Sequence, residues 1–97
     1  MIPQDILDLV DSRARGQIRG RARIVIDDIG ALVLDETGAT LDETGTDAAD
    51  VTLTAAEAVF RAILDGSQNP ITAVMRGKLK VDGNPKRALK VSEILTG

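Results

Sequence analysis

Between Gly66 and Leu95 the apolar and polar residues follow three successive patterns, which predict a helix, a strand and a second helix. Asn69-Pro70 and Asn84-Pro85 each predict a helix start, because Asn accepts a hydrogen bond from an early backbone N–H and Pro lacks the donor that would be unpaired there. Gly77 suits the left-handed residue that follows the end of the first helix. Residues 78–82, Lys-Leu-Lys-Val-Asp, alternate with period two, as a strand with one buried face does. The last helix, from Pro85 to about Leu95, is expected to turn four apolar side chains inward: Ala88, Val91, Ile94 and Leu95.

A helix and three strands are predicted before residue 43. The strand pattern covers residues 21–26, a hairpin turn follows at 27–30, and residues 31–34 return as a strand that is apolar on both faces and so should be central. Residues 39–42 are expected to form a short edge strand. The opening helix, from Ile2 to about Arg13, is expected to carry this apolar stripe: Ile6, Leu7, Leu9 and Val10.

Residues 50–66 predict a strand that leads into a helix. Val51 to Leu53 form the strand, and Thr54 and Glu57 are spaced as a capping box, in which each side chain bonds the other residue's backbone N–H. Asp65-Gly66 is expected to end the helix. Spacings of three and four predict these buried residues on it: Ala56, Val59, Phe60, Ile63 and Leu64.

The predicted order of elements is therefore α-β-β-β-β-α-α-β-α. Early strands and late helices favour an α+β fold, in which helices cover one face of a five-stranded, largely antiparallel sheet. A chain of 97 residues is expected to form a single domain over residues 1–97.

The composition argues against most catalytic classes. The chain has no His and no Cys, so it lacks the usual general base, the thiolate nucleophile and the soft metal ligands. We therefore expect no enzyme activity, no metal site and no cofactor. Phe60 is the single aromatic residue and the net charge is −3, which argues against nucleic-acid binding.

The distribution of hydrophobic residues bears on location. No apolar run approaches the ~20 residues of a membrane-spanning helix. Residues 1–5, Met-Ile-Pro-Gln-Asp, are acidic where a secretory leader is basic. We expect a cytoplasmic protein.

A seven-residue repeat, Leu-Asp-Glu-Thr-Gly, occurs at residues 34–38 and again at residues 41–45. Paired carboxylates in Gly-ended turns suggest a divalent cation site, but the spacing fits no calcium-loop pattern. Solvated turns at the two ends of an edge strand are the preferred interpretation.

Charged residues are segregated along the chain. Five Arg residues fall within positions 13–23, acids dominate residues 27–65, and six bases accompany one acid in residues 76–90. These segments are either ordinary solvated faces or rims, a basic one for anionic lipid headgroups or an acidic one for a basic partner.

Residues 75–84, Met-Arg-Gly-Lys-Leu-Lys-Val-Asp-Gly-Asn, follow a strand-to-helix passage at residues 50–60 that ends in Gly66. This arrangement resembles the sterol-binding domain of type-2 sterol carrier proteins, in its stand-alone bacterial form. The match is nearly continuous over residues 50–95 and is one of pattern alone over residues 19–41. The family usually has Phe where this chain has Val74, and apolar residues where it has Pro-Lys-Arg at 85–87. The second difference bears on the width and polarity of one ligand entrance.

The resemblance implies a non-catalytic carrier with an apolar cavity between the sheet and the C-terminal helices. Its implied ligands are a fatty acyl chain, a sterol-like molecule or an isoprenoid quinone precursor, and its implied partners include a transiently contacted membrane surface. Met75 is expected at the cavity wall because its thioether adapts to varied shapes. The residues expected to line the cavity are Val59, Phe60, Ile63, Leu64, Ile71, Val74, Met75, Leu79, Val81, Ala88, Val91, Ile94 and Leu95.

An alternative function is a protein-interaction module that has the same fold and a closed core. An empty cavity of ~300 Å³ costs on the order of 7 kcal/mol, against a total stability of about 5–15 kcal/mol. A cavity of that size should therefore be filled by lipid, or largely collapsed when no ligand is bound.

Overall fold

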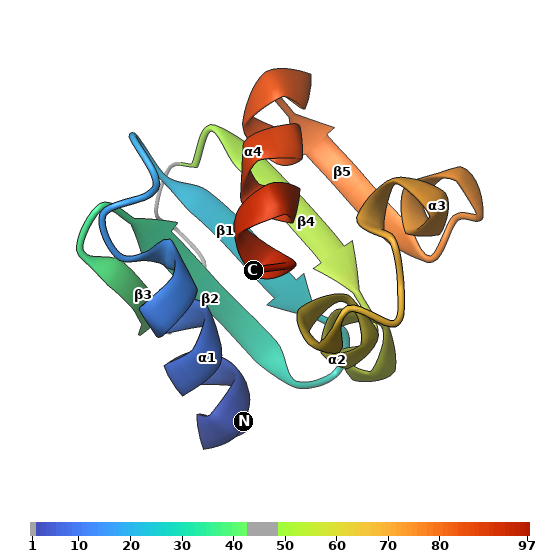
Figure 1. Cartoon of the computed structure of the whole chain (residues 1–97), viewed down its shortest axis with the longest axis horizontal. Helices are drawn as coiled ribbons and strands as arrows, with labels where there is room; N and C mark the ends of the chain where they lie inside the picture. The colour runs from blue at the N-terminus through green and yellow to red at the C-terminus, as the bar shows by residue number, and fades with distance from the viewer. Residues whose placement is uncertain (1, 43–48) are drawn as a thin grey trace.

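The computed structural model describes residues 2–42 and 49–97. Within these residues four helices and five strands follow one another in the predicted order, so the predicted α+β fold is confirmed (Figure 1). The elements are α1 (Gln4–Ala14), β1 (Ala22–Ile26), β2 (Gly30–Asp35), β3 (Gly38–Leu41), β4 (Val51–Ala55), α2 (Glu57–Asp65), α3 (Pro70–Met75), β5 (Leu79–Gly83) and α4 (Pro85–Leu95).

The five strands form one mixed sheet in the order β3-β2-β1-β4-β5. The inner pair β1–β4 is parallel, with Ile24 opposite Leu53, and the other three pairs are antiparallel. In Figure 1, α1 crosses the β2–β3 side of the sheet and α4 crosses β1 and β4, so the helices lie on one face. Of the remaining helices, α3 lies beside β5 and α2 lies past the end of β4 (Figure 1).

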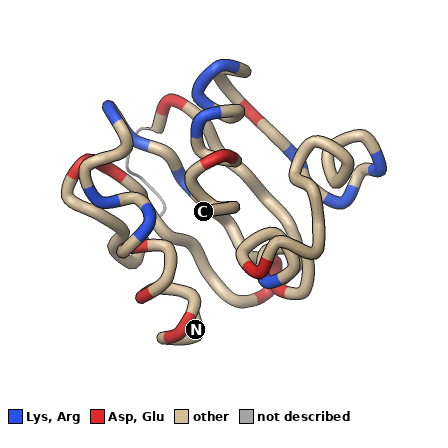
Figure 2. Tube along the Cα trace, viewed as in Figure 1, with Lys and Arg blue, Asp and Glu red and all other residues tan. Residues whose placement is uncertain are grey.

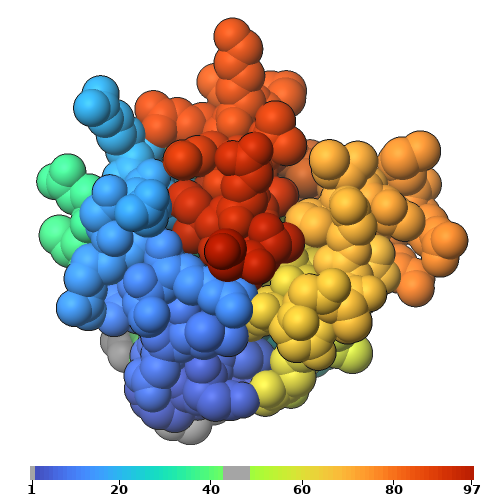
Figure 3. All heavy atoms as spheres, viewed as in Figure 1, coloured from blue at the N-terminus to red at the C-terminus, as the bar shows by residue number. Residues whose placement is uncertain are grey.

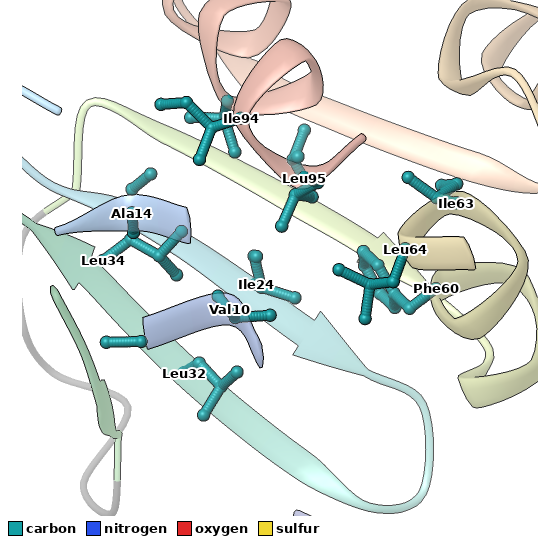
Figure 4. Close-up of a cluster of buried hydrophobic side chains, with 14 of the residues drawn as sticks. Val10, Ala14, Ile24, Leu32, Leu34, Phe60, Ile63, Leu64, Ile94 and Leu95 are labelled. Atoms are coloured by element: carbon teal, nitrogen blue, oxygen red, sulfur yellow. The ribbon is translucent and has the colours of Figure 1, made fainter. Parts of the chain in front are cut away.

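The core lies between this face of the sheet and helices α1, α2 and α4. Alternate residues of β1 and β4 are buried, as the period of two requires. Phe60 is 2% exposed, so the single ring of the chain belongs to the core. Figure 4 shows the contributing side chains, among them Val10, Ala14, Ile24, Leu32, Leu34, Phe60, Ile63, Leu64, Ile94 and Leu95.

Arg13 joins the carboxyl-terminal ends of three helices. It lies in the last turn of α1, and its Nη1 donates to the carbonyl oxygen of Leu64 in α2 (2.8 Å) and to that of Leu95 in α4. Carbonyl groups in the last turn of a helix have no partner within the helix, and they carry the negative end of the helix dipole. One guanidinium therefore satisfies two otherwise unpaired acceptors and fixes the three helices relative to one another.

Asp11 attaches α1 to the start of β3. Its Oδ1 accepts a hydrogen bond from the backbone N–H of Ala39 at 2.8 Å. This bond, together with the guanidinium of Arg15, lowers the pKa of Asp11. The N-terminal helix is thus attached to the edge of the sheet by a charge-assisted bond.

The two Asn-Pro helix starts are confirmed. The Oδ1 of Asn69 accepts from the N–H groups of Ile71 (2.8 Å) and Thr72 (3.3 Å), and Asn84 does the same for the first turn of α4. Gly77 has the left-handed conformation predicted for it, with φ of 73°.

The predicted capping box at Thr54 and Glu57 is wrong. β4 extends to Ala55, so Thr54 belongs to the strand and pairs with Val25 on one side and Lys80 on the other. The residue that precedes α2 is Ala56, which has no capping side chain, and Glu57 instead bonds Arg61 at 2.7 Å. Pairing on both sides of β4 outweighs the local capping signal.

Smaller differences concern burial on two helices. Leu9 and Ala56, both expected in the core, are exposed, and Val59 is only partly buried. On α1 the predicted residues Ile6 and Val10 are buried, and Ala14 is buried in addition. The apolar stripe is therefore rotated slightly and runs one turn further than predicted.

The first copy of the acidic repeat forms a turn, as predicted. Asp35 accepts from the backbone N–H of Thr37 at 2.9 Å, and Thr37, through its side chain and its N–H, lowers the pKa of Asp35. In the second copy, Asp42 pairs with Arg23 at 2.7 Å, and residues 43–45 lie outside the described residues. Within residues 2–42 and 49–97 there is no group of three or more acidic side chains placed to hold a metal ion.

We predict that Gly83→Ala destabilises the fold strongly. Gly83 has φ of 111°, and an added Cβ would lie 2.4 Å from the carbonyl oxygen of Asp50, which is backbone and cannot move away. The free energy of unfolding, measured with urea, should fall by about 2–4 kcal/mol. Gly77→Ala is the control, because it shares the left-handed backbone and meets no atom within 4 Å, so it should cost about 1 kcal/mol. Equal losses in the two variants would contradict the close approach.

We predict that Arg13→Met lowers the free energy of unfolding by about 1.5–3 kcal/mol, because two partly buried carbonyl groups lose a charged donor. The same change at Arg15, whose side chain is exposed and pairs with Asp11, should cost less than about 0.5 kcal/mol. Chemical unfolding of both variants tests this, and no difference between them would refute the role of Arg13.

Candidate functional site

The short helix α3 leaves most of its apolar side chains exposed. It has six residues, and its buried members are Pro70 and Ala73. Its other apolar residues are much more accessible, with Ile71 57%, Val74 41% and Met75 81% exposed. A monomeric protein seldom gathers large apolar side chains on its surface without a function for them.

An apolar groove runs between α3, β5 and α4. Val81 of β5 and Leu89 of α4 are 37% and 50% exposed, and both face the side chains of α3 across a hollow of about 340 Å³. In Figure 3 the surface is indented between α4, in red, and α3, in yellow-orange. The residues that line this groove are Pro70, Ile71, Val74, Met75, Val81, Pro85, Ala88, Leu89 and Ser92.

The groove continues into a second hollow toward the carboxyl end of α4, which is more polar than the groove although most of its lining is still apolar. This second hollow has a volume of about 380 Å³ and shares Pro70, Ile71, Leu89 and Ser92 with the groove. Its further lining residues are Gly66, Gln68, Asn69, Glu93 and Thr96. The two hollows together make one elongated site with an apolar end near β5 and a polar end near the loop between α2 and α3.

The loop between α2 and α3, which borders the polar end, has a conformation fixed by local hydrogen bonds. Gly66 ends α2 in the left-handed conformation, with φ of 87°. Asp65 Oδ1 accepts from the backbone N–H of Ser67 at 2.8 Å, and Ser67, through its side chain and its N–H, lowers the pKa of Asp65. The chain then reaches Asn69, whose side chain starts α3. A tight, hydrogen-bonded loop therefore sets the distance between α2 and α3.

The structure divides the predicted ligand-lining residues into two groups. Five of them line the groove: Ile71, Val74, Met75, Val81 and Ala88. Seven are buried in the core beneath it: Phe60, Ile63, Leu64, Leu79, Val91, Ile94 and Leu95. Val59 is partly buried against that core. Their role in holding a ligand remains a prediction for both groups.

Four groove residues were not predicted from the sequence: Pro70, Pro85, Leu89 and Ser92. In the sequence, Pro70 and Pro85 indicate only helix starts. Leu89 follows Pro85 by four residues and precedes Ser92 by three, so a second stripe along α4 was present in the sequence. That stripe was masked by the stronger inward stripe of Ala88, Val91 and Leu95.

Basic residues lie near the apolar end of the site. Arg76 and Lys78 lie in the turn from α3 to β5, and Lys86 follows the groove residue Pro85 at the start of α4. All three are exposed, and Figure 2 shows the basic positions at the α3–β5 turn and at the start of α4. Lys80 and Asp82 of β5 are also exposed but alternate with Val81, so they lie on the other face of the sheet, and Lys90 lines a separate hollow on the other side of α4. Of the Pro-Lys-Arg sequence at 85–87, Pro85 lines the groove, while the guanidinium of Arg87 donates to the carbonyl oxygen of Arg19.

The chain matches the SCP-2 sterol transfer family over residues 4–96, and it belongs to that family. The family predicted from residues 50–95 is therefore confirmed. Sterol carrier protein 2 of Homo sapiens is 41% identical over 46 residues, which cover 47% of this chain and 8% of the human protein. Members of the family are generally lipid carriers rather than enzymes.

Two solved structures show the same fold. The sterol carrier protein domain 2 of Helicoverpa armigera has a TM-score of 0.72 and 21% identity, covering 95% of this chain and 83% of that chain. Palmitated SCP2L2 from Aedes aegypti has a TM-score of 0.74 and 17% identity, covering 100% of this chain and 96% of that chain. At these identities the likeness concerns the fold alone.

The helices of the described part are all too short or too polar to cross a lipid bilayer.

Proposed function

We propose that this protein is a non-catalytic carrier that binds the apolar part of a lipid-like molecule in the groove between α3, β5 and α4. The main support is that five large apolar side chains from three elements are exposed around one hollow. They are Ile71, Val74, Met75, Val81 and Leu89. The hollow's volume of about 340 Å³ falls within the range of ~300–1,000 Å³ that is usual for small-molecule sites.

The energetics favour such a ligand. Burying each CH₂ group contributes about 0.8 kcal/mol, so a chain of about ten carbons contributes on the order of 8 kcal/mol before the costs of association. An open groove also avoids the cavity cost that an enclosed, empty tunnel would carry. The site can therefore stay partly formed without a ligand and close over one when it binds.

Family membership supports this proposal over a protein-interaction module. The relatives are sterol carriers by name, and the Aedes aegypti structure is palmitated. A fatty acyl chain, a sterol-like molecule and an isoprenoid quinone precursor are the proposed ligand classes. A cytoplasmic location stays a prediction.

We predict that Leu89→Glu weakens lipid binding at least about tenfold, because it places a charge in the middle of the apolar groove. Binding can be measured through the fluorescence of N-phenyl-1-naphthylamine, an uncharged dye, and its displacement by lipids. Leu41→Glu is the matched control, since Leu41 is 44% exposed on β3, compared with 50% for Leu89.

The control should bind the dye as the native chain does, and circular dichroism should show both variants folded. The proposal fails if native protein binds neither dye nor lipid, or if Leu41→Glu weakens binding as much as Leu89→Glu.

We propose further that the basic residues near the apolar end of the groove bring it against an anionic membrane surface during ligand transfer. Met75, 81% exposed, is followed by Arg76 and Lys78, which are exposed too, so an apolar side chain and two positive charges lie in one short turn. Each base near an anionic leaflet contributes about 1 kcal/mol.

We predict that the double variant Arg76→Glu, Lys78→Glu lowers partitioning onto phosphatidylserine-containing vesicles by at least about 30-fold, with no effect on phosphatidylcholine vesicles. Sedimentation with the vesicles measures this partitioning. Arg15→Glu, Arg19→Glu makes the same change in net charge on the α1 side of the molecule and should have a much smaller effect. Equal losses in the two double variants would show that net charge alone acts.

A further inference from the structure

The polar end of the site is rich in unused hydrogen-bond acceptors on the α4 side. The hydroxyl of Ser92 donates to the carbonyl oxygen of Ala88 at 2.9 Å, and the hydroxyl of Thr96 donates to that of Glu93 at 2.9 Å. Each hydroxyl has one proton, so both oxygens have only lone pairs left for a ligand. The Glu93 carboxylate, which lies between them along the helix, is also an acceptor.

Donors on the opposite wall are few. Asn69 Oδ1 occupies the N–H groups of Ile71 and Thr72, so the start of α3 has these donors already bonded. One N–H of the Gln68 amide bonds the carbonyl oxygen of Asn69 at 2.9 Å. The second N–H of Gln68 and the side-chain amide N–H groups of Asn69 remain available on this wall.

The charge of the polar end is negative. Among the described residues that line it, Glu93 is the charged one, and none is a Lys or an Arg. Arg13, Arg15 and Lys90 line a separate hollow on the other side of α4, and Glu93 lies at the boundary and lines both hollows. An ionised carboxylate in the polar end would meet a like charge, would lose water, and would have no proton to give to Ser92 or Thr96.

We infer that the site selects a lipid whose head is an uncharged hydroxyl over one whose head is an ionised carboxylate. The hydroxyl donates to the α4 wall at Ser92, Thr96 or Glu93 and accepts from the amide of Asn69 or Gln68. The tail lies along the apolar groove toward Met75 and Val81. This inference rests on the proposed function, since it assigns a head-group class to the same site.

The test compares dodecan-1-ol and dodecanoate, which share a chain length and differ in the head, at about pH 8 and below their aggregation concentrations. Displacement of N-phenyl-1-naphthylamine from the full chain should give a dissociation constant at least about tenfold lower for the alcohol. Because the ionised acid also prefers water intrinsically, variants must show that the protein contributes to this ratio.

Glu93→Lys should tighten dodecanoate binding about threefold to tenfold and change dodecanol binding by less than about twofold, as expected when a like charge near the head becomes an opposite one. Asp82→Lys is the matched control, since it makes the same change in net charge. Asp82 alternates with the groove residue Val81 on β5 and so lies on the other face of the sheet. The control should shift neither ligand by more than about twofold.

Nuclear Overhauser contacts give the orientation independently. The CH₂ group beside the hydroxyl should contact the Thr96 methyl group, and the terminal methyl of the alcohol should contact the Met75 methyl group. The inference is overturned if dodecanoate binds native protein as tightly as dodecanol, if Glu93→Lys and Asp82→Lys act alike, or if the contacts are reversed. If neither lipid displaces the dye, the proposed function itself fails, and the inference fails with it.

Discussion

The guanidinium of Arg13 is the interaction on which the arrangement of the helices depends. It bonds carbonyl oxygens at the ends of α2 and α4 from its own position at the end of α1, so three helix ends that carry like partial charges meet at one cation. The core closes beneath these three helices. α3 lies outside the group, held by its Asn69 cap and its packing on β5. α3 buries only Pro70 and Ala73, and the groove exists because the other apolar side chains of α3 are not covered by the helices that meet at Arg13.

Much of this fold could be predicted because its signals are local. Asn69 and Asn84 start helices through bonds to residues two and three positions away, so the whole signal lies within a few consecutive residues. Thr54 shows the opposite case: its capping spacing was sound, but strands from two other parts of the chain pair with it. Tertiary hydrogen bonds decided that boundary, and sequence spacing alone does not contain them.

The site was harder to predict than the fold. On α4, both Val91 and Leu89 are apolar and both fall on stripes with helical spacing, yet the first is 2% exposed and the second 50%. The difference depends on where α3 lies, which is set by the loop after Gly66 and by the pairing of β5 with β4. Periodicity identifies apolar faces but not what covers them. The same limit explains why Phe60 and Met75 were predicted together, although one lies in the core and the other at the surface.

The position of β5 at the edge of the sheet has a consequence for the behaviour of the protein at high concentration. An outermost strand offers unpaired backbone groups to any passing chain, and here apolar side chains lie beside it. Lys80 and Asp82 alternate with the apolar residues of this strand, and Lys78 immediately precedes it. Bringing these charges against a second copy would strip them of water, which disfavours edge-to-edge aggregation. The charges on β5 therefore disfavour pairing with a second copy of the chain, while the groove beside the strand stays accessible to a small ligand.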